Sequence, residues 1–179
     1  MTLFLATLLV GLALLLLGAA LVADTPLVRA ALRGFPRSRV AAWVLFGLAT
    51  VWFLSRVAVL SEADFGQFRN QLFIGFAAVA ALSFFYVPEF LAVRGLAALA
   101  LLAGEPLLRP AYGAYDIPSR LALVTVVYLA LATSVWLGAQ PWRLRDWIEW
   151  LQRVPGRARL VGAGFAAGGA ALTVIAFTY

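Results

Sequence analysis

The 179-residue chain contains no cysteine, no histidine and no lysine. Without cysteine it has neither a disulfide framework nor a thiolate metal site. Without histidine it lacks the usual axial ligand of haem, the commonest zinc ligand and the most frequent general base. Without lysine it can form neither a Schiff base nor the lysine contact of a P-loop. We therefore expect no catalytic residues, no metal and no cofactor, and we predict that the protein is not an enzyme.

Charge is also scarce. Charged residues make up 12% of the chain and apolar residues 64%, with a mean hydropathy of +0.96. An ordinary soluble domain is about half apolar and about a quarter charged, so this composition predicts a single transmembrane domain over residues 1–179. The net charge of +6 is carried by arginine, which collects in the cytoplasmic loops of membrane proteins. Membrane orientation therefore explains the charge, and we expect no nucleic-acid partner.

Long apolar stretches define the membrane spans, because a hydrocarbon core about 30 Å thick needs about 20 helical residues. The stretch 70–108 is too long for one helix, and Pro88 is expected to divide it at a tight turn. The resulting fourth span is short, with Gly104-Glu105-Pro106 expected to end it, so it either spans or re-enters the membrane. The sequence predicts an all-α, polytopic transmembrane helical bundle with six spans. These are residues 2–23, 41–60, 70–86, 90–103, 121–137 and 160–177.

Two arginine-rich segments, residues 24–39 and 140–159, connect the first and the last pair of spans. In each, apolar residues recur at helical spacing with arginines opposite, which predicts amphipathic helices lying in the membrane interface. Six crossings place both segments in the cytoplasm and both termini on the outer side. The two span pairs then have the same orientation, which is a parallel internal repeat. The predicted location is the inner (cytoplasmic) membrane of a bacterium.

The last third of the chain, from Ser119, carries a recognisable series of short motifs. A helix is followed by Pro141-Trp142-Arg143, then by Val154-Pro155, and then by Arg159-Leu160-Val161-Gly162, which opens a glycine-rich helix. This pattern resembles the small bacterial YjeT-like two-helix membrane proteins, and the four preceding helices lie outside it. Those proteins have no established activity, and in some genomes they lie beside genes for membrane-protease regulators. The resemblance implies a bacterial inner-membrane protein.

The ionisable groups nearest the bilayer are candidate functional residues, because burying them is costly and they often mark pathways. Glu89 and Arg94 are expected to reach water as boundary charges, or else to pair loosely or to line a cytoplasmic-side vestibule. Arg56, near the outer end of the second span, is expected either to reach water or to contact Glu62 or Asp64.

Small and aromatic residues mark two further candidate surfaces. Gly164 and Gly168 of the last span allow another helix to approach closely, either within this chain or from another subunit. Trp142, Trp147 and Trp150 are expected to anchor the second amphipathic segment at the membrane interface.

Three functions are compatible with these features. The favoured one is a non-catalytic accessory or scaffold subunit of a larger bacterial membrane assembly. Its partner, a different protein or a second copy, would bind through the sixth span or the amphipathic linkers, besides the lipid bilayer itself. The second is a small transporter or channel, which predicts a polar cavity near Glu89 and Arg94 but lacks an acidic residue at any span's centre. The third is a lipid-modifying enzyme, which predicts that Glu89, Asp146 and Glu149 share a pocket.

Overall fold

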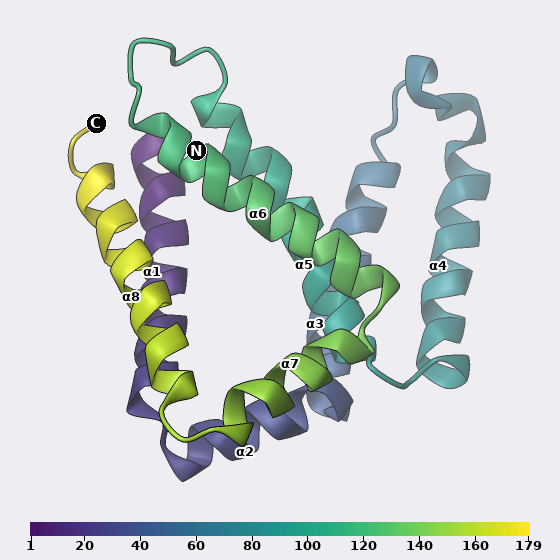
Figure 1. Ribbon diagram of the computed structural model, residues 1–179. Coiled ribbons are helices and arrows are strands. Elements are labelled where there is room, and N and C mark those ends of the chain that lie inside the picture. Colours follow the sequence, from purple (N-terminus) through teal and green to yellow (C-terminus); the bar gives the residue numbers. More distant parts are fainter.

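The computed structural model describes all 179 residues and contains helices but no strands (Figure 1). Six helices are long and apolar enough to cross a membrane, which suggests a membrane-embedded protein and confirms the all-α fold with six candidate spans. They are α1 (Leu3–Ala23), α3 (Arg39–Val57), α4 (Arg69–Tyr86), α5 (Leu91–Leu108), α6 (Arg120–Ala139) and α8 (Arg157–Ala176). The arginine-rich segments contain α2 (Pro26–Gly34) and α7 (Trp142–Arg153). Short 3-10 turns lie at Phe35–Arg37 (η1), Glu62–Asp64 (η2), Gly66–Phe68 (η3) and Arg109–Ala111 (η4).

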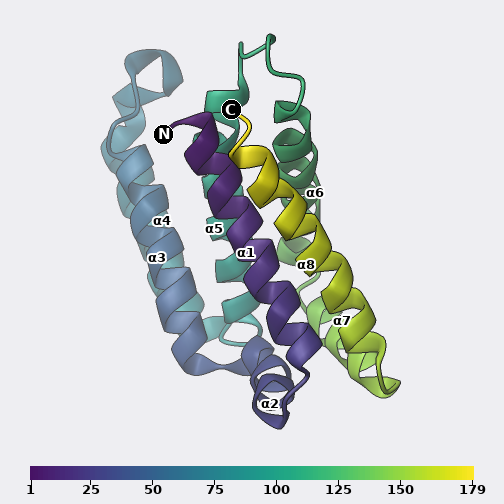
Figure 2. The same ribbon diagram turned by 90° about the vertical axis from the view of Figure 1, so that its left-hand side faces the viewer.

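The turn from α1 into α2 is encoded by three consecutive residues, Asp24, Thr25 and Pro26. Asp24 ends α1 in the left-handed conformation, with φ of 45°. The Thr25 hydroxyl then accepts a hydrogen bond from the Val28 amide (3.3 Å), and Pro26 occupies the first helical position. A threonine cap followed by proline is a strong helix start. The chain therefore passes from a spanning helix to a helix lying across the end of the bundle (Figure 2).

The fourth span is a full-length helix, α5, of 18 residues. The expectation that Gly104-Glu105-Pro106 would end it is therefore wrong. Pro106 lies inside the helix, in its last turn, and removes one backbone hydrogen bond because it has no N–H to donate to the carbonyl four residues earlier. Packing supplies the compensation, because α5 lies between α3 and α6 and is the most buried of the six candidate spans. A Cβ added at Gly95 would lie 2.4 Å from the Phe46 nitrogen, so the backbones of α5 and α3 are in direct contact.

The most extensive helix pair joins the two ends of the sequence, α1 and α8, which lie side by side (Figures 1 and 2). Their glycines form a seam. A Cβ added at Gly18 would lie 2.3 Å from the Ala166 nitrogen, and one added at Gly169 would lie 2.4 Å from the Leu15 nitrogen. Such close backbone contact is the usual way in which spanning helices associate, because lipid provides no hydrophobic drive between them.

Gly164 and Gly168 lie outside this seam. Both are exposed, and a Cβ added at either position meets nothing within 4 Å. The seam on α8 uses Gly162 and Gly169 instead. Residues seven apart share a helix face, whereas Gly164 lies 200° around the helix from Gly162 at about 100° per residue. The alternative in which Gly164 and Gly168 pack against another helix of this chain is therefore wrong. Their contact with another subunit stays a prediction.

The two ends of the bundle differ in charge. The termini and the α3–α4 and α5–α6 connections lie at one end, and α2, α7 and the α4–α5 turn lie at the other (Figure 1). The second end, called here the arginine-rich end, holds ten of the fourteen arginines and four of the eight acidic residues, so it carries the whole net charge of +6. Its arginines are Arg29, Arg33, Arg37, Arg39, Arg94, Arg143, Arg145, Arg153, Arg157 and Arg159.

Candidate functional site

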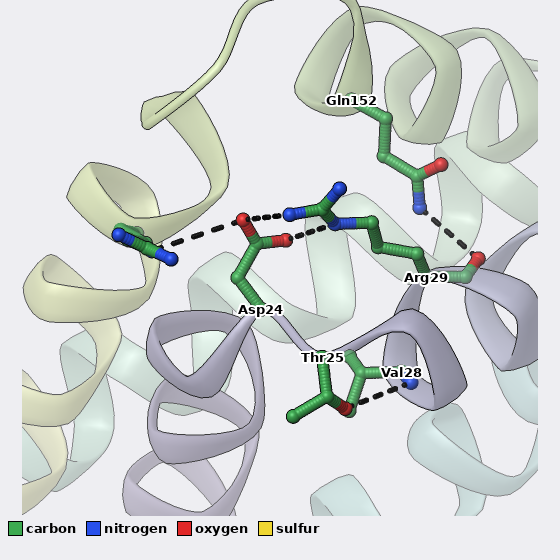
Figure 3. Close-up of polar contacts among 6 residues, drawn as sticks. Asp24, Thr25, Val28, Arg29 and Gln152 are labelled. Atoms are coloured by element: carbon green, nitrogen blue, oxygen red, sulfur yellow. Dashed lines mark hydrogen bonds and ion pairs between the residues drawn. The ribbon is translucent and has the colours of Figure 1, made fainter.

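A buried carboxylate joins three helices at the arginine-rich end (Figure 3). The Asp24 side chain is only 10% exposed, and its two oxygens accept hydrogen bonds from Nε and Nη2 of Arg29, each at 2.8 Å. Arg159 of α8 places its Nε 3.8 Å from Asp24 Oδ2. The hydrogen bond from Arg29 holds the pKa of the Asp24 carboxyl below its ordinary value. We call this arrangement the Asp24 junction; it ties α1 to α2 and α8.

Gln152 extends the junction to α7. Its Nε2 donates to the Arg29 carbonyl oxygen at 3.2 Å, and its Oε1 accepts a hydrogen bond from Arg33 Nε. Beneath it, Leu151 is fully buried against Leu21 and Ala158. One polar side chain and one apolar side chain, adjacent on α7, therefore fix this helix on α2 and on the ends of α1 and α8.

An open groove of about 490 Å³ lies between α2 and α7 beside this junction. Four guanidinium groups and one carboxylate line it, so its lining carries a net charge of +3 at neutral pH. We call it the arginine groove; its lining residues are Arg33, Pro36, Arg37, Arg145, Ile148, Glu149, Gln152 and Arg153.

The four arginines of the groove differ in how they are paired. Arg145 Nη2 lies 2.8 Å from Asp146 Oδ1 and its Nε lies 3.7 Å from Glu149, and the hydrogen bond to Asp146 raises the pKa of Arg145. Arg33, Arg37 and Arg153 form no ion pair. Three guanidinium groups thus face one groove without a carboxylate partner. Guanidinium forks match the oxygens of carboxylates and phosphates, so the groove can bind an anion.

Glu89 and Arg94 are not brought together. Glu89 is exposed in the α4–α5 turn, Arg94 is half-buried on α5, and no ion pair joins them. Neither residue lines any of the larger cavities. The alternative in which they pair is therefore wrong, and their role as boundary charges stays a prediction.

Arg56 pairs with a residue that the sequence did not point to. Its Nη2 lies 2.7 Å from Glu105 Oε2 on α5, so the expected contact with Glu62 or Asp64 is wrong. Arg109 approaches the other oxygen of Glu105 at 3.8 Å. The partners Arg56 and Glu105 are 49 residues apart, and only the packing of α3 on α5 brings them together.

The tryptophans of α7 have exposed rings. Trp142, Trp147 and Trp150 all lie at the arginine-rich end, whereas the buried side of the helix is formed by Ile148 and Leu151. This orientation leaves the indoles available to lipid, and their role as interfacial anchors stays a prediction.

Apart from Glu149 in the enzyme alternative, the sequence singled out no residue of the Asp24 junction or the arginine groove as functional. It marked their arginines only as the charge of two cytoplasmic segments, and it gave no role to Asp24 or Gln152. Asp24 had a usable signal, because an acidic residue directly before Thr-Pro at the end of an apolar span marks a charged helix end. Gln152 had none, since nothing local distinguishes it from any other polar residue on the outer side of an amphipathic helix.

A second cavity, of about 450 Å³, lies between α3, α4 and α5 and is almost wholly apolar. We call it the α4 gap; it is lined by Phe46, Ala49, Thr50, Phe53, Leu54, Phe76, Val79, Ala80, Ala98, Leu101 and Leu102. No residue of α4 is buried. Its contacts with α3 are largely aromatic, with ring centroids 4.1 Å apart for Trp43 and Phe84 and 5.0 Å apart for Phe53 and Phe76.

Comparison with known proteins gives no match, whether with family models, curated proteins or solved structures. The resemblance of the last third to the YjeT-like proteins therefore stays a prediction.

Proposed function

We propose that the chain is a non-catalytic accessory or scaffold subunit of a larger assembly in the cytoplasmic membrane of a bacterium. The observation that carries the proposal is α4, a helix of spanning length in which no residue is buried. Helices in a membrane associate through close packing, because apolar side chains gain nothing by leaving lipid for another apolar surface. Because α4 contacts α3 mainly through aromatic side chains on one face, its other faces are available to a further helix.

The α4 gap supports this interpretation. A void between helices forfeits the dispersion contacts that its lining atoms would otherwise make. The gap is open and apolar, so an apolar helix from a partner can recover those contacts. Ile74, Val79 and Phe85 add a largely exposed apolar surface along the same helix.

The proposed orientation places the arginine-rich end in the cytoplasm and both termini outside. Arginine and lysine are enriched in cytoplasmic connections. In this protein one end carries a net charge of +6 and the other none, so the asymmetry strongly favours one orientation.

The geometry favours a subunit over the two other functions. A transporter requires polar groups along its path, but the cavity between the spans is apolar and Glu89 and Arg94 lie outside it. A lipid-modifying enzyme of the expected kind requires Glu89, Asp146 and Glu149 in one pocket, but of these three only Glu149 lines the arginine groove.

Photo-crosslinking from α4 in the native membrane tests the proposal. A photoreactive phenylalanine analogue replaces Phe85, which is 77% exposed, and in the matched control it replaces Leu129 of α6, which is 63% exposed. We expect a single adduct with a different protein in high yield from position 85, and the same protein in a stoichiometric complex after extraction in mild detergent. Adducts of equal yield from both positions, or a solitary chain after extraction, would contradict the proposal.

A further inference from the structure

We infer that the arginine groove is a binding site for the phosphate-bearing headgroup of an anionic phospholipid. The groove lies at the arginine-rich end of the bundle and shares no residue with the α4 gap, so the inference does not require a partner on α4. It rests on the proposed function only for the placement of that end at the cytoplasmic face of a membrane. The positive charge of the groove is not balanced by its own carboxylate. Arg33, Arg37 and Arg153 line one groove with no carboxylate within ion-pair distance, while Glu149 is engaged by Arg145. Like charges held together in this way repel one another, and a bound anion relieves that repulsion.

The position of the groove points to lipid as the source of the anion. α2 and α7 lie across the ends of the long apolar helices (Figures 1 and 2). In a membrane that these helices cross, this is the level at which the hydrocarbon core ends. The exposed indoles of Trp142, Trp147 and Trp150 lie on the same helix. Tryptophan concentrates at the level of the lipid headgroups, so the groove lies at the depth of the phosphates of the surrounding leaflet. Basic pockets between spanning helices on the cytoplasmic side are suited to anionic headgroups.

The groove is also partly ordered before any ligand binds. Gln152 holds the Arg33 guanidinium, and Arg37 lies 5.8 Å from the centre of the Phe90 ring. Guanidinium groups fixed in this way lose little conformational entropy when they grip phosphate oxygens. Arg153 makes no hydrogen bond and is free to close on the ligand. Pro36 and Ile148 are buried at the base of the groove and form an apolar floor beneath the charged groups.

The charge of the groove also sets its selectivity. A lining with a net charge of +3 attracts a headgroup of net negative charge and repels the ammonium group of a zwitterionic one. Phosphatidylglycerol should therefore bind more tightly than phosphatidylcholine.

Native mass spectrometry of the full chain in detergent, titrated with either lipid, measures this preference. Arg37→Gln and Arg153→Gln each remove one charge from the groove. Arg143→Gln is the matched control, because Arg143 lies on the same helix as Arg153 but outside the groove, where it bonds to Gln140. We expect each groove variant to weaken phosphatidylglycerol binding about fivefold and the control to leave it unchanged. Arg153→Lys, which keeps the charge, should retain most of the binding.

Several results would overturn the inference. Equal binding of phosphatidylglycerol and phosphatidylcholine would exclude recognition of headgroup charge. Equal losses in Arg143→Gln and Arg153→Gln would show a diffuse surface effect in place of a site. Displacement of the lipid by millimolar inorganic phosphate would identify a site for free phosphate. Arg153 is exposed and forms no ion pair, so its variant decides the question even if Arg37→Gln fails to fold.

Discussion

Substitution of Gly169 by alanine should separate the helix pair that joins the two ends of the chain. The new Cβ would lie 2.4 Å from the Leu15 nitrogen and 2.6 Å from the Gly11 oxygen, whereas ordinary contact begins at 3.4 Å. Both obstructing atoms belong to the backbone, so no side chain can turn aside and α1 as a whole must move by about 1 Å. Overpacking of this kind costs about 1–3 kcal/mol. Moving α1 away from α8 also opens a gap along the rest of the seam, where the two helices lose part of their dispersion attraction. Alanine gains about 1 kcal/mol over glycine in a helix, so we expect a net loss of up to about 2 kcal/mol in the free energy of unfolding.

The neighbouring residue provides the control. A Cβ at Gly168 meets nothing within 4 Å, so Gly168→Ala should keep only the gain in helix propensity, at most about 1 kcal/mol. The two variants gain the same helix propensity, so their free energies of unfolding should differ by the overpacking cost alone, about 1–3 kcal/mol. Titration of the detergent-solubilised protein with dodecyl sulfate, followed by near-ultraviolet circular dichroism, measures that difference. Equal stabilities would refute the glycine seam.

Two further predictions concern charged groups. Because the Arg29 hydrogen bond lowers the pKa of Asp24, the folded chain binds this proton less tightly than the unfolded chain does. This difference stabilises the folded chain. The stabilisation should be complete above about pH 4 and should be lost as the pH falls through the lowered pKa of Asp24. Unfolding midpoints measured between about pH 7 and pH 3 should show this acid dependence in the natural chain and not in Asp24→Asn. By contrast, the side chains of Arg56 and Glu105 are both 55% exposed, so their ion pair should contribute little to stability. Glu105→Gln should change the free energy of unfolding, measured by dodecyl sulfate titration, by less than about 1 kcal/mol. A larger loss would show that this pair supports the packing of α3 on α5.

The sequence predicted the number and approximate positions of the six long apolar helices, because hydropathy and length act locally along the chain. It predicted the end of α5 wrongly. Gly104-Glu105-Pro106 has the composition of a helix end, but α5 continues to Leu108 while packed between α3 and α6. Tertiary contacts on both sides of α5 outweigh the cost of a proline inside a helix, which is about 3 kcal/mol.

The candidate site was less accessible from the sequence. The arginine-rich segments were evident, but the division of their arginines into paired and unpaired groups depends on where each side chain lies. Arg145 is neutralised by its neighbour Asp146, whereas Arg153, eight residues later on the same helix, has no partner. Such distinctions follow from side-chain geometry, which helical periodicity does not determine.

The sequence by itself determined that this protein is built from apolar helices, that arginine gathers in the segments around two amphipathic helices, and that the chemistry of cysteine, histidine and lysine is absent. These properties depend on composition and on the local periodicity of the helix. Only the tertiary structure decided which glycines form the α1–α8 seam, that Glu105 is the partner of Arg56, and that α2 and α7 enclose the arginine groove. Each of these depends on helices distant in sequence meeting at a particular rotation, and a face that is free in one arrangement is buried in another.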